Sequence, residues 1–140
     1  MKEALIDANV ILRYLTKDPP AMAEAALKIF NDARSGKISL SIIPITVAEV
    51  VWVLESFYGY SKQQISDTMT QFLLCEGLDV GDLDILLGAL TLYFEKNLDF
   101  ADAILATTAL RKGPSIIYSF DRHLNRVDGL KRLEPSHGNS

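Results

Sequence analysis

The segment ALIDANVIL, residues 4–12, decides how the first part of the chain is expected to fold. The apolar residues before Asp7 are typical of a buried strand, and those after Asn9 are typical of an apolar helix. A buried carboxylate without a partner costs several kcal/mol and normally takes up a proton instead. Either the chain turns here and these side chains cap a helix, or a cation lies against Asp7.

The composition is that of a compact protein. At 140 residues the chain can bury about two thirds of its unfolded surface, and 49% hydrophobic with 23% charged residues is ordinary for a soluble fold. We expect one domain over residues 1–134 and a disordered tail at 135–140. The longest apolar run, residues 40–54, contains Pro44 and Glu49 and is too short to span a bilayer. The first residues lack the plan of a signal peptide, so we expect a cytoplasmic location.

Cysteine and charge usage limit the possible functions further. Cys75 is the single cysteine, so we expect neither a disulfide nor a Cys-based zinc site. The net charge of −4 does not suggest a nucleic-acid-binding protein, but the charges are unevenly distributed. Residues 76–102 contain seven acids and one base, whereas residues 111–132 contain six bases and two acids. This basic segment could contact a phosphate backbone or could form a solvated surface, and the sequence leaves both open.

Strand-like and helix-like segments alternate along the chain. Short β-rich segments are predicted at residues 5–6, 38–43, 78–80, 115–118 and 130–133. Helices are predicted at residues 9–15, 21–33, 46–58, 61–75, 83–98 and 101–111. The alternation predicts an α/β fold in which helices enclose a central parallel sheet of about five short strands.

Four acids fall near the predicted strand and helix ends. Asp7 leaves the first strand, and Asp121 follows the fourth. Glu49 and Asp102 lie near the N-termini of helices that are expected to start at the same edge of the sheet. Open parallel sheets bind their ligands at the carboxyl ends of the strands. The sequence therefore predicts four carboxylates at one ligand-binding edge.

Each acid also has an ordinary structural explanation. Asn9 could cap a helix, and Asp7 could form an Asx-type turn. Thr46 and Glu49 have the spacing of a capping box. Asp102 lies where the helix dipole favours an acid. These explanations do not account for four acids at one edge beside apolar runs.

Electrostatic repulsion favours a metal at such an edge. Two carboxylates ~4–5 Å apart repel by roughly 3–4 kcal/mol at an effective dielectric constant of ~20. Several together would raise one another's pKa and destabilise the fold unless a divalent cation joined them. Carboxylate oxygens without cysteine or paired histidine favour hard ions such as Mg²⁺ or Mn²⁺. These ions suit phosphodiester cleavage, because they activate water and neutralise developing charge.

Four blocks of sequence resemble, in their order and spacing, the signature of the PIN domain family and, within it, of the small VapC-type toxins of toxin–antitoxin pairs. They are LIDANVIL (residues 5–12), TVAEVVWVL (46–54), DFADAILA (99–106) and YSFDRHL (118–124). The resemblance implies a three-layer α/β/α fold around a five-stranded parallel sheet. It also implies Mg²⁺- or Mn²⁺-dependent cleavage of RNA, a homodimer, and inhibition by a cognate antitoxin.

The resemblance assigns roles to residues by position. Metal binding and catalysis would fall to Asp7, Glu49, Asp102 and Asp121. Supporting positions would be Asn9, Asp99 and Ser119. No acid of the pattern is missing, and Ser119 keeps the hydroxyl of the threonine found in many members. Within the basic segment, the candidates for contact with RNA phosphate are Arg111, Lys112, Arg122 and Arg126.

Two other functions remain open. A strand followed by aspartate also begins the phosphatases of the haloacid-dehalogenase type, but these need a second aspartate where this chain has Asn9. A catalytically silent PIN-like scaffold that binds RNA or protein is the other alternative, and the presence of all four acids argues against it. Neither His123 nor His137 has a partner at metal-binding spacing, so we do not expect them to bind a metal. The sequence does not identify the target RNA, which surface shape and RNA fold would select.

Overall fold

The computed structural model describes residues 2–136. These residues form two compact units, one up to residue 83 and the other from residue 84 onward. The expectation of one domain over residues 1–134 stays a prediction. Of the tail expected at 135–140, residues 137–140 lie outside the described residues.

The first unit is built on a three-stranded parallel sheet. Its strands, in sheet order, are β1 (Lys2–Leu5), β2 (Ile38–Ile42) and β3 (Leu78–Val80). Leu5 pairs with Ser41, and Ile42 pairs with Val80, so all three strands end at the same edge. Asp7 follows β1 at that edge.

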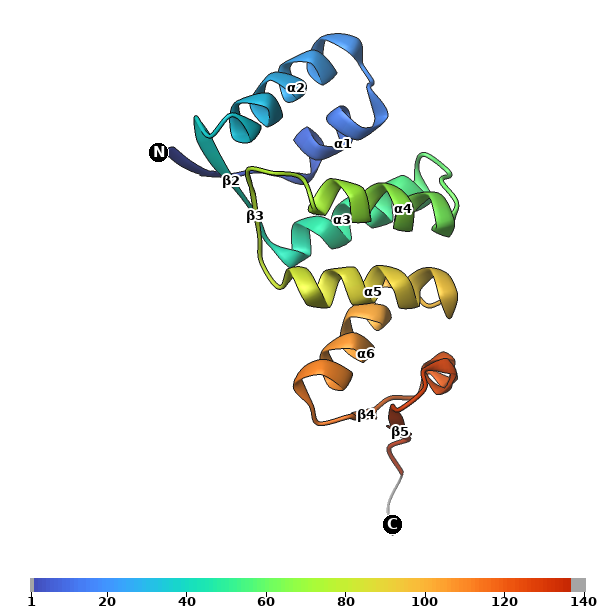
Figure 1. Cartoon of the computed structure of the whole chain (residues 1–140). Coiled ribbons are helices and arrows are strands. Elements are labelled where there is room, and N and C mark those ends of the chain that lie inside the picture. The colour runs from blue at the N-terminus through green and yellow to red at the C-terminus, as the bar shows by residue number, and fades with distance from the viewer. Residues whose placement is uncertain (1, 137–140) are drawn as a thin grey trace. The chain divides into compact units, whose positions relative to one another are not determined.

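The helices of the first unit pack on one another beside this sheet. They are α1 (Ala8–Thr16), α2 (Pro20–Arg34), α3 (Pro44–Ser56) and α4 (Lys62–Leu73). Helices α1 and α2 form a hairpin, and α3 contacts both α1 and α4 (Figure 1). The ring of Phe30 lies 4.5 Å from that of Tyr14 and 5.5 Å from that of Phe72, centroid to centroid. These aromatic contacts fix α1, α2 and α4 together.

The core of the first unit comes from apolar residues at helical spacing in the segments predicted as helices. Fully buried side chains on α1, α3 and α4 include Ile11, Val47, Leu54, Ile65 and Met69. The spacing of four residues between Ile65 and Met69 places them on one face of α4, as the helical pattern predicts.

The second unit contains two helices, a two-stranded parallel sheet and a short 3₁₀ helix. Its elements are α5 (Leu83–Glu95), α6 (Phe100–Lys112), β4 (Ile116–Tyr118), η1 (Arg122–Arg126) and β5 (Lys131–Leu133). Helices α5 and α6 approach closely at Gly88, where an added Cβ would lie 2.8 Å from Cγ2 of Thr107. The rings of Tyr93 and Phe100 meet edge to face, with centroids 5.7 Å apart. Glycine at position 88 therefore permits this packing.

The structure confirms the α/β class and the predicted order of elements. Within residues 2–136 all five strands and all six α-helices form, with ends shifted by a few residues at most. The strand pairings are all parallel, but three strands share one sheet and two share another. A local sequence pattern predicts that a segment is a strand but not which strand it will bond to, so the expected single sheet was not derivable from it. No helix in this part of the chain is long and apolar enough to cross a bilayer.

Candidate active site

Asp7 is the N-cap of α1. Its backbone is extended, with φ −93° and ψ 170°, and its Oδ1 accepts a hydrogen bond from the N–H of Val10 at 3.1 Å. Asn9 is not the cap, because α1 begins at Ala8 and Asn9 lies within its first turn. Asp7 is exposed, and its Oδ2 accepts no hydrogen bond from residues 2–136. One oxygen of this carboxylate is thus available to a ligand while the other caps the helix.

Glu49 lies in the second turn of α3. Thr46 and Glu49 do not form the capping box that their spacing allows, because α3 begins at Pro44 with Ile43 as its N-cap. Proline suits the first helical position, since its φ is already helical and it has no N–H to satisfy. Glu49 is exposed on a face that it shares with Ile45 and Trp52, which are 74% and 65% exposed.

Two acids lie at the N-terminus of α6 in the second unit. Asp99 is the N-cap, although its side chain makes no capping hydrogen bond. Asp102 lies in the first helical turn and is half-buried. The helix dipole favours negative charge at both positions. The helix therefore offsets part of the cost of holding two acids close together.

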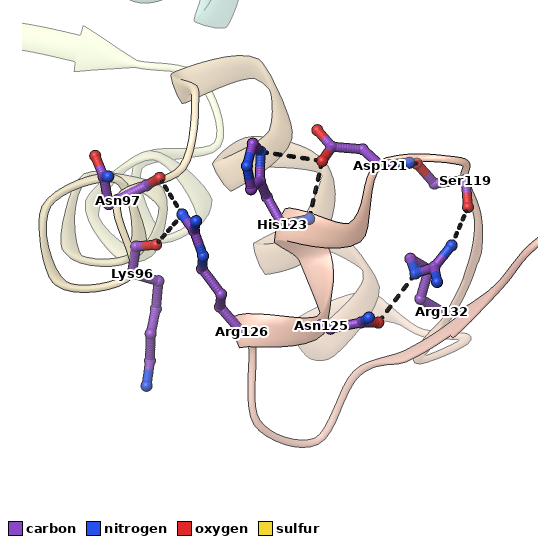
Figure 2. Close-up of polar contacts among 8 residues, drawn as sticks. All are labelled: Lys96, Asn97, Ser119, Asp121, His123, Asn125, Arg126 and Arg132. Carbon is purple, nitrogen blue, oxygen red and sulfur yellow. Dashed lines mark hydrogen bonds and ion pairs between the residues drawn. The ribbon is translucent and has the colours of Figure 1, made fainter.

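Asp121 is held between β4 and η1 by its own neighbours (Figure 2). Its Oδ1 accepts a hydrogen bond from the backbone N–H of His123 at 2.9 Å and lies 3.1 Å from Nδ1 of the same histidine. The N–H of Asp121 donates to Oγ of Ser119 at 2.9 Å. The conformation of Asp121 is therefore fixed on both sides, by Ser119 before it and His123 after it.

The carboxyl groups of Asp102 and Asp121 lie close enough to affect each other's pKa. Burial raises the pKa of Asp102, and the hydrogen bond and charge of Asp121 and the charge of Asp99 raise it further, while His123 opposes them. The pKa of Asp121 is lowered, chiefly by the hydrogen bond from the N–H of His123. As the pH falls, Asp102 is therefore protonated before Asp121.

Sequence reasoning missed two residues of this cluster. From the sequence, His123 was considered only as a metal ligand, and the structure shows it as the direct partner of Asp121. The spacing of two residues after an N-cap aspartate was the available signal, since it suits an Asx-type turn. Arg132 on β5 also contacts this loop, through the carbonyl of Ser119 at 2.7 Å. No local pattern indicates that contact, because it depends on the pairing of β4 with β5.

The predicted RNA-binding residues differ in their surroundings. Arg111 lies 4.0 Å from Asp84, beside Gly88. Nη1 of Arg126 donates to the carbonyls of Asn97 at 2.9 Å and Lys96 at 3.3 Å, just beyond the end of α5 (Figure 2). Lys112 and Arg122 are exposed. Arg126 thus has a structural role in closing the end of α5.

The chemistry of these side chains fits a hard divalent ion. Asp102 and Asp121 in the second unit offer carboxylate oxygens, which are the ligands that Mg²⁺ and Mn²⁺ prefer, and Asp7 in the first unit separately offers the same kind of ligand. A pair of neighbouring carboxylates, with a raised pKa at one of them, is the electrostatic situation that a cation relieves. Within residues 2–136 no three or more Asp, Glu, His or Cys side chains already stand in a metal-binding arrangement.

The chain thus combines a parallel α/β fold with acidic side chains at the ends of its strands and helices. The model of the PIN domain family matches residues 4–130, so the chain belongs to the PIN domain family. PIN domains are generally nucleases that bind RNA and use divalent metal ions. A nuclease role therefore follows from family membership. A comparison with curated proteins found no match.

Proposed function

We propose that this protein is a Mg²⁺- or Mn²⁺-dependent endoribonuclease that acts as the toxin of a toxin–antitoxin pair. The observation that carries the proposal is the pair of neighbouring acids Asp102 and Asp121, in which burial and the nearby acids raise the pKa of Asp102. A strained pair of acids costs folding free energy and is typical of functional sites. Membership of the PIN family supports a nuclease, and the four blocks around Asp7, Glu49, Asp102 and Asp121 support the VapC-type assignment.

The proposal assigns roles by chemistry and by position in these blocks. Metal binding and catalysis belong to Asp7, Glu49, Asp102 and Asp121. Asn9, Asp99 and Ser119 support them, and the bond from the Asp121 N–H to Ser119 is the kind of contact that such support requires. When bound, the metal supplies an activated water and neutralises charge that develops on the phosphodiester. Asp102 must lose its proton before it can act as a ligand, so activity should increase as the pH rises through its pKa.

The test is RNA cleavage by Asp7→Asn and Asp102→Asn in Mg²⁺. Each substitution removes an anionic oxygen at nearly constant volume, so we expect activity to be abolished while the fold is retained. Asp79→Asn is the matched control, since Asp79 is an exposed acid on β3 outside the proposed site. Cleavage by either site variant at the wild-type rate, with contaminating nuclease excluded, would refute the assignment.

The same preparations separate the alternatives. RNA binding without metal-dependent cleavage by the wild type would indicate the silent scaffold. Hydrolysis of a phosphomonoester such as p-nitrophenyl phosphate, without cleavage of RNA, would indicate the phosphatase. Metal-dependent cutting of single-stranded or structured RNA supports the proposal, and the fragments would identify the target that the sequence does not.

A groove on the first unit supports the proposal of an antitoxin. It has a volume of about 370 Å³ and lies between α1 and α2, with a largely apolar lining of Asp7, Asn9, Val10, Arg13, Met22, Ala25, Ala26 and Ile29. Amphipathic helices bind such grooves through apolar anchors. Asp7 lies at the groove, so an arginine or lysine of the same segment could pair with it. We therefore propose that the C-terminal segment of a cognate antitoxin binds here and blocks Asp7.

Helices α3 and α4 are the candidates for the apolar contact of the proposed homodimer, and only α3 has apolar side chains exposed for it. The apolar residues of α4, including Ile65 and Met69, are buried within the first unit. On α3, by contrast, Ile45 and Trp52 are exposed, and Phe57 just beyond the helix is 78% exposed. We propose that the C-terminal end of α3, with Trp52 and Phe57, forms the dimer contact. Trp52→Glu should then shift the mass in light scattering from dimer to monomer, whereas Gln63→Glu, an exposed site on α4, should not.

RNA contact by the basic segment stays part of the proposal for Arg111, Lys112 and Arg122. Each phosphate contact that is lost should reduce the salt dependence of RNA binding. Arg126 is the exception to that expectation, because its guanidinium already binds two backbone carbonyls.

A further inference from the structure

Arg132 on β5 has the most extensive set of side-chain contacts around the Asp121 loop (Figure 2). Its Nη1 donates to the carbonyl of Ser119 at 2.7 Å and to Oε1 of Glu134 at 3.2 Å. Its Nε donates to Oδ1 of Asn125 at 3.0 Å. The side chain is only 12% exposed, which is unusual for an arginine outside a binding or structural role. These contacts use the planar fork of the guanidinium, which lysine lacks.

The two main partners of Arg132 stand on either side of Asp121. Ser119 precedes Asp121 by two residues, and Asn125 follows it by four, within η1. Ser119 is itself fully engaged, because its N–H donates to the carbonyl of Leu133 at 2.9 Å and its Oγ accepts from the N–H of Asp121 at 2.9 Å. A single guanidinium therefore ties both ends of the loop that carries Asp121 to β5.

We propose that Arg132 is a positioning residue, which fixes the carboxylate of Asp121 toward Asp102 by holding Ser119 and Asn125. This inference rests on the proposed function, in which Asp121 must be correctly oriented to bind the metal. Without Arg132, the carbonyl of Ser119 and the amide of Asn125 lose their donor, so the loop that carries Asp121 is less restrained. Residues that orient metal ligands from behind typically contribute 10–100-fold to metal affinity or activity.

The experiment compares Arg132→Met with Lys131→Met and Arg132→Lys. Lys131 is the neighbouring, exposed base on β5, so its variant removes the same charge from the same strand without touching the loop. Hydrogen exchange of the Asp121 and His123 amides is measured by NMR in metal-free protein, and Mn²⁺ affinity by calorimetry. RNA cleavage is then followed at several Mn²⁺ concentrations.

For Arg132→Met we expect faster exchange of both amides and Mn²⁺ affinity about 10–100-fold weaker. We also expect a lower kcat with an unchanged KM for RNA, which high Mn²⁺ partly restores. Arg132→Lys keeps the charge but lacks the planar fork, so its amide exchange, Mn²⁺ affinity and kcat should lie between those of the wild type and Arg132→Met. This variant also provides the test if Arg132→Met does not fold. Lys131→Met should retain wild-type exchange and Mn²⁺ affinity.

Two outcomes would overturn the proposal. One is the same amide exchange at Asp121 and His123 in Arg132→Met as in Lys131→Met. The other is faster exchange with unchanged Mn²⁺ affinity, which would reduce Arg132 to a purely structural residue. If the wild type neither binds Mn²⁺ nor cuts RNA, the proposed function fails, and amide exchange alone then decides whether Arg132 positions Asp121.

Discussion

Replacing Asp102 by asparagine should stabilise the metal-free protein at neutral pH. The pKa of Asp102 is raised by burial and by Asp121 and Asp99, so the folded state binds its proton more tightly than the unfolded state. Ionisation at pH 7 therefore costs stability, and asparagine avoids that cost. The gain should be largest where Asp102 is ionised, should shrink as the pH falls through the raised pKa, and should vanish below the ordinary aspartate value of 3.8.

The size of this gain follows from the exposure of the pair. The Asp121 side chain is 37% exposed, so water screens the interaction strongly. Two unit charges about 4 Å apart repel by about 1 kcal/mol at the dielectric constant of water. A net gain on the order of 1 kcal/mol corresponds to a rise of ~3 °C in Tm for a chain of this length.

The assay is thermal unfolding in chelator between pH 4 and pH 8. Asp121→Asn is the matched comparison from the same cluster and should have the opposite sign. The pKa of Asp121 is lowered by the N–H of His123, so its ionised form stabilises the fold above the ordinary aspartate pKa, and that contribution is lost on acidification. If Asp102 were only a helix-capping acid, Asp102→Asn would lose about 0.3–1 kcal/mol of dipole interaction instead. A lower Tm for this variant at pH 7 would refute the reasoning.

Three further predictions concern metal binding and packing. Millimolar Mg²⁺ should raise the Tm of the wild type more than that of Asp102→Asn, as calorimetry would show. The added stability is ~2.7 kcal/mol when the Mg²⁺ concentration is 100 times the Kd. Equal Tm shifts in the two proteins would exclude Asp102 as a ligand. Gly77→Ala should lower the free energy of unfolding in urea by several kcal/mol, since its Cβ would collide with the carbonyl of Ala33 at a φ of +86°. Gly36→Ala is the control, because it has a similar φ of +82° but nothing within 4 Å, and it should lower that free energy by only ~1–2 kcal/mol. Met69→Ala should cost ~2–5 kcal/mol because Met69 is 0% exposed, while the exposed Gln71→Ala should be close to neutral.

The sequence predicted the elements well because their signals are local. The strand expected at residues 78–80 forms at Leu78–Val80, and the apolar stripe of Ile65 and Met69 faces the core. The sequence predicts a helix that starts at Thr46, whereas α3 begins two residues earlier at Pro44. Helix ends depend on which of two local signals prevails, and proline imposes the stronger constraint.

The candidate site was predictable in its residue types but not in its contacts. Position in the chain identified Asp102 and Asp121, and their proximity in the structure supports treating them as a pair. The roles of Arg132 and Arg126 could not be anticipated, since both act on backbone carbonyls far away in sequence. Any backbone carbonyl can accept such a bond, so the sequence does not indicate which carbonyl each arginine will bind.

The two walls of the groove between α1 and α2 differ in what they contain. One includes Asp7, whereas the α2 wall, with Met22, Ala25 and Ile29, contains none of the acids proposed for catalysis. If the proposed antitoxin segment binds here, substitutions in the α2 wall would alter which segment fits without changing those acids. Under the same proposal, related toxins in one genome would stay matched to their own inhibitors through differences in α2 alone.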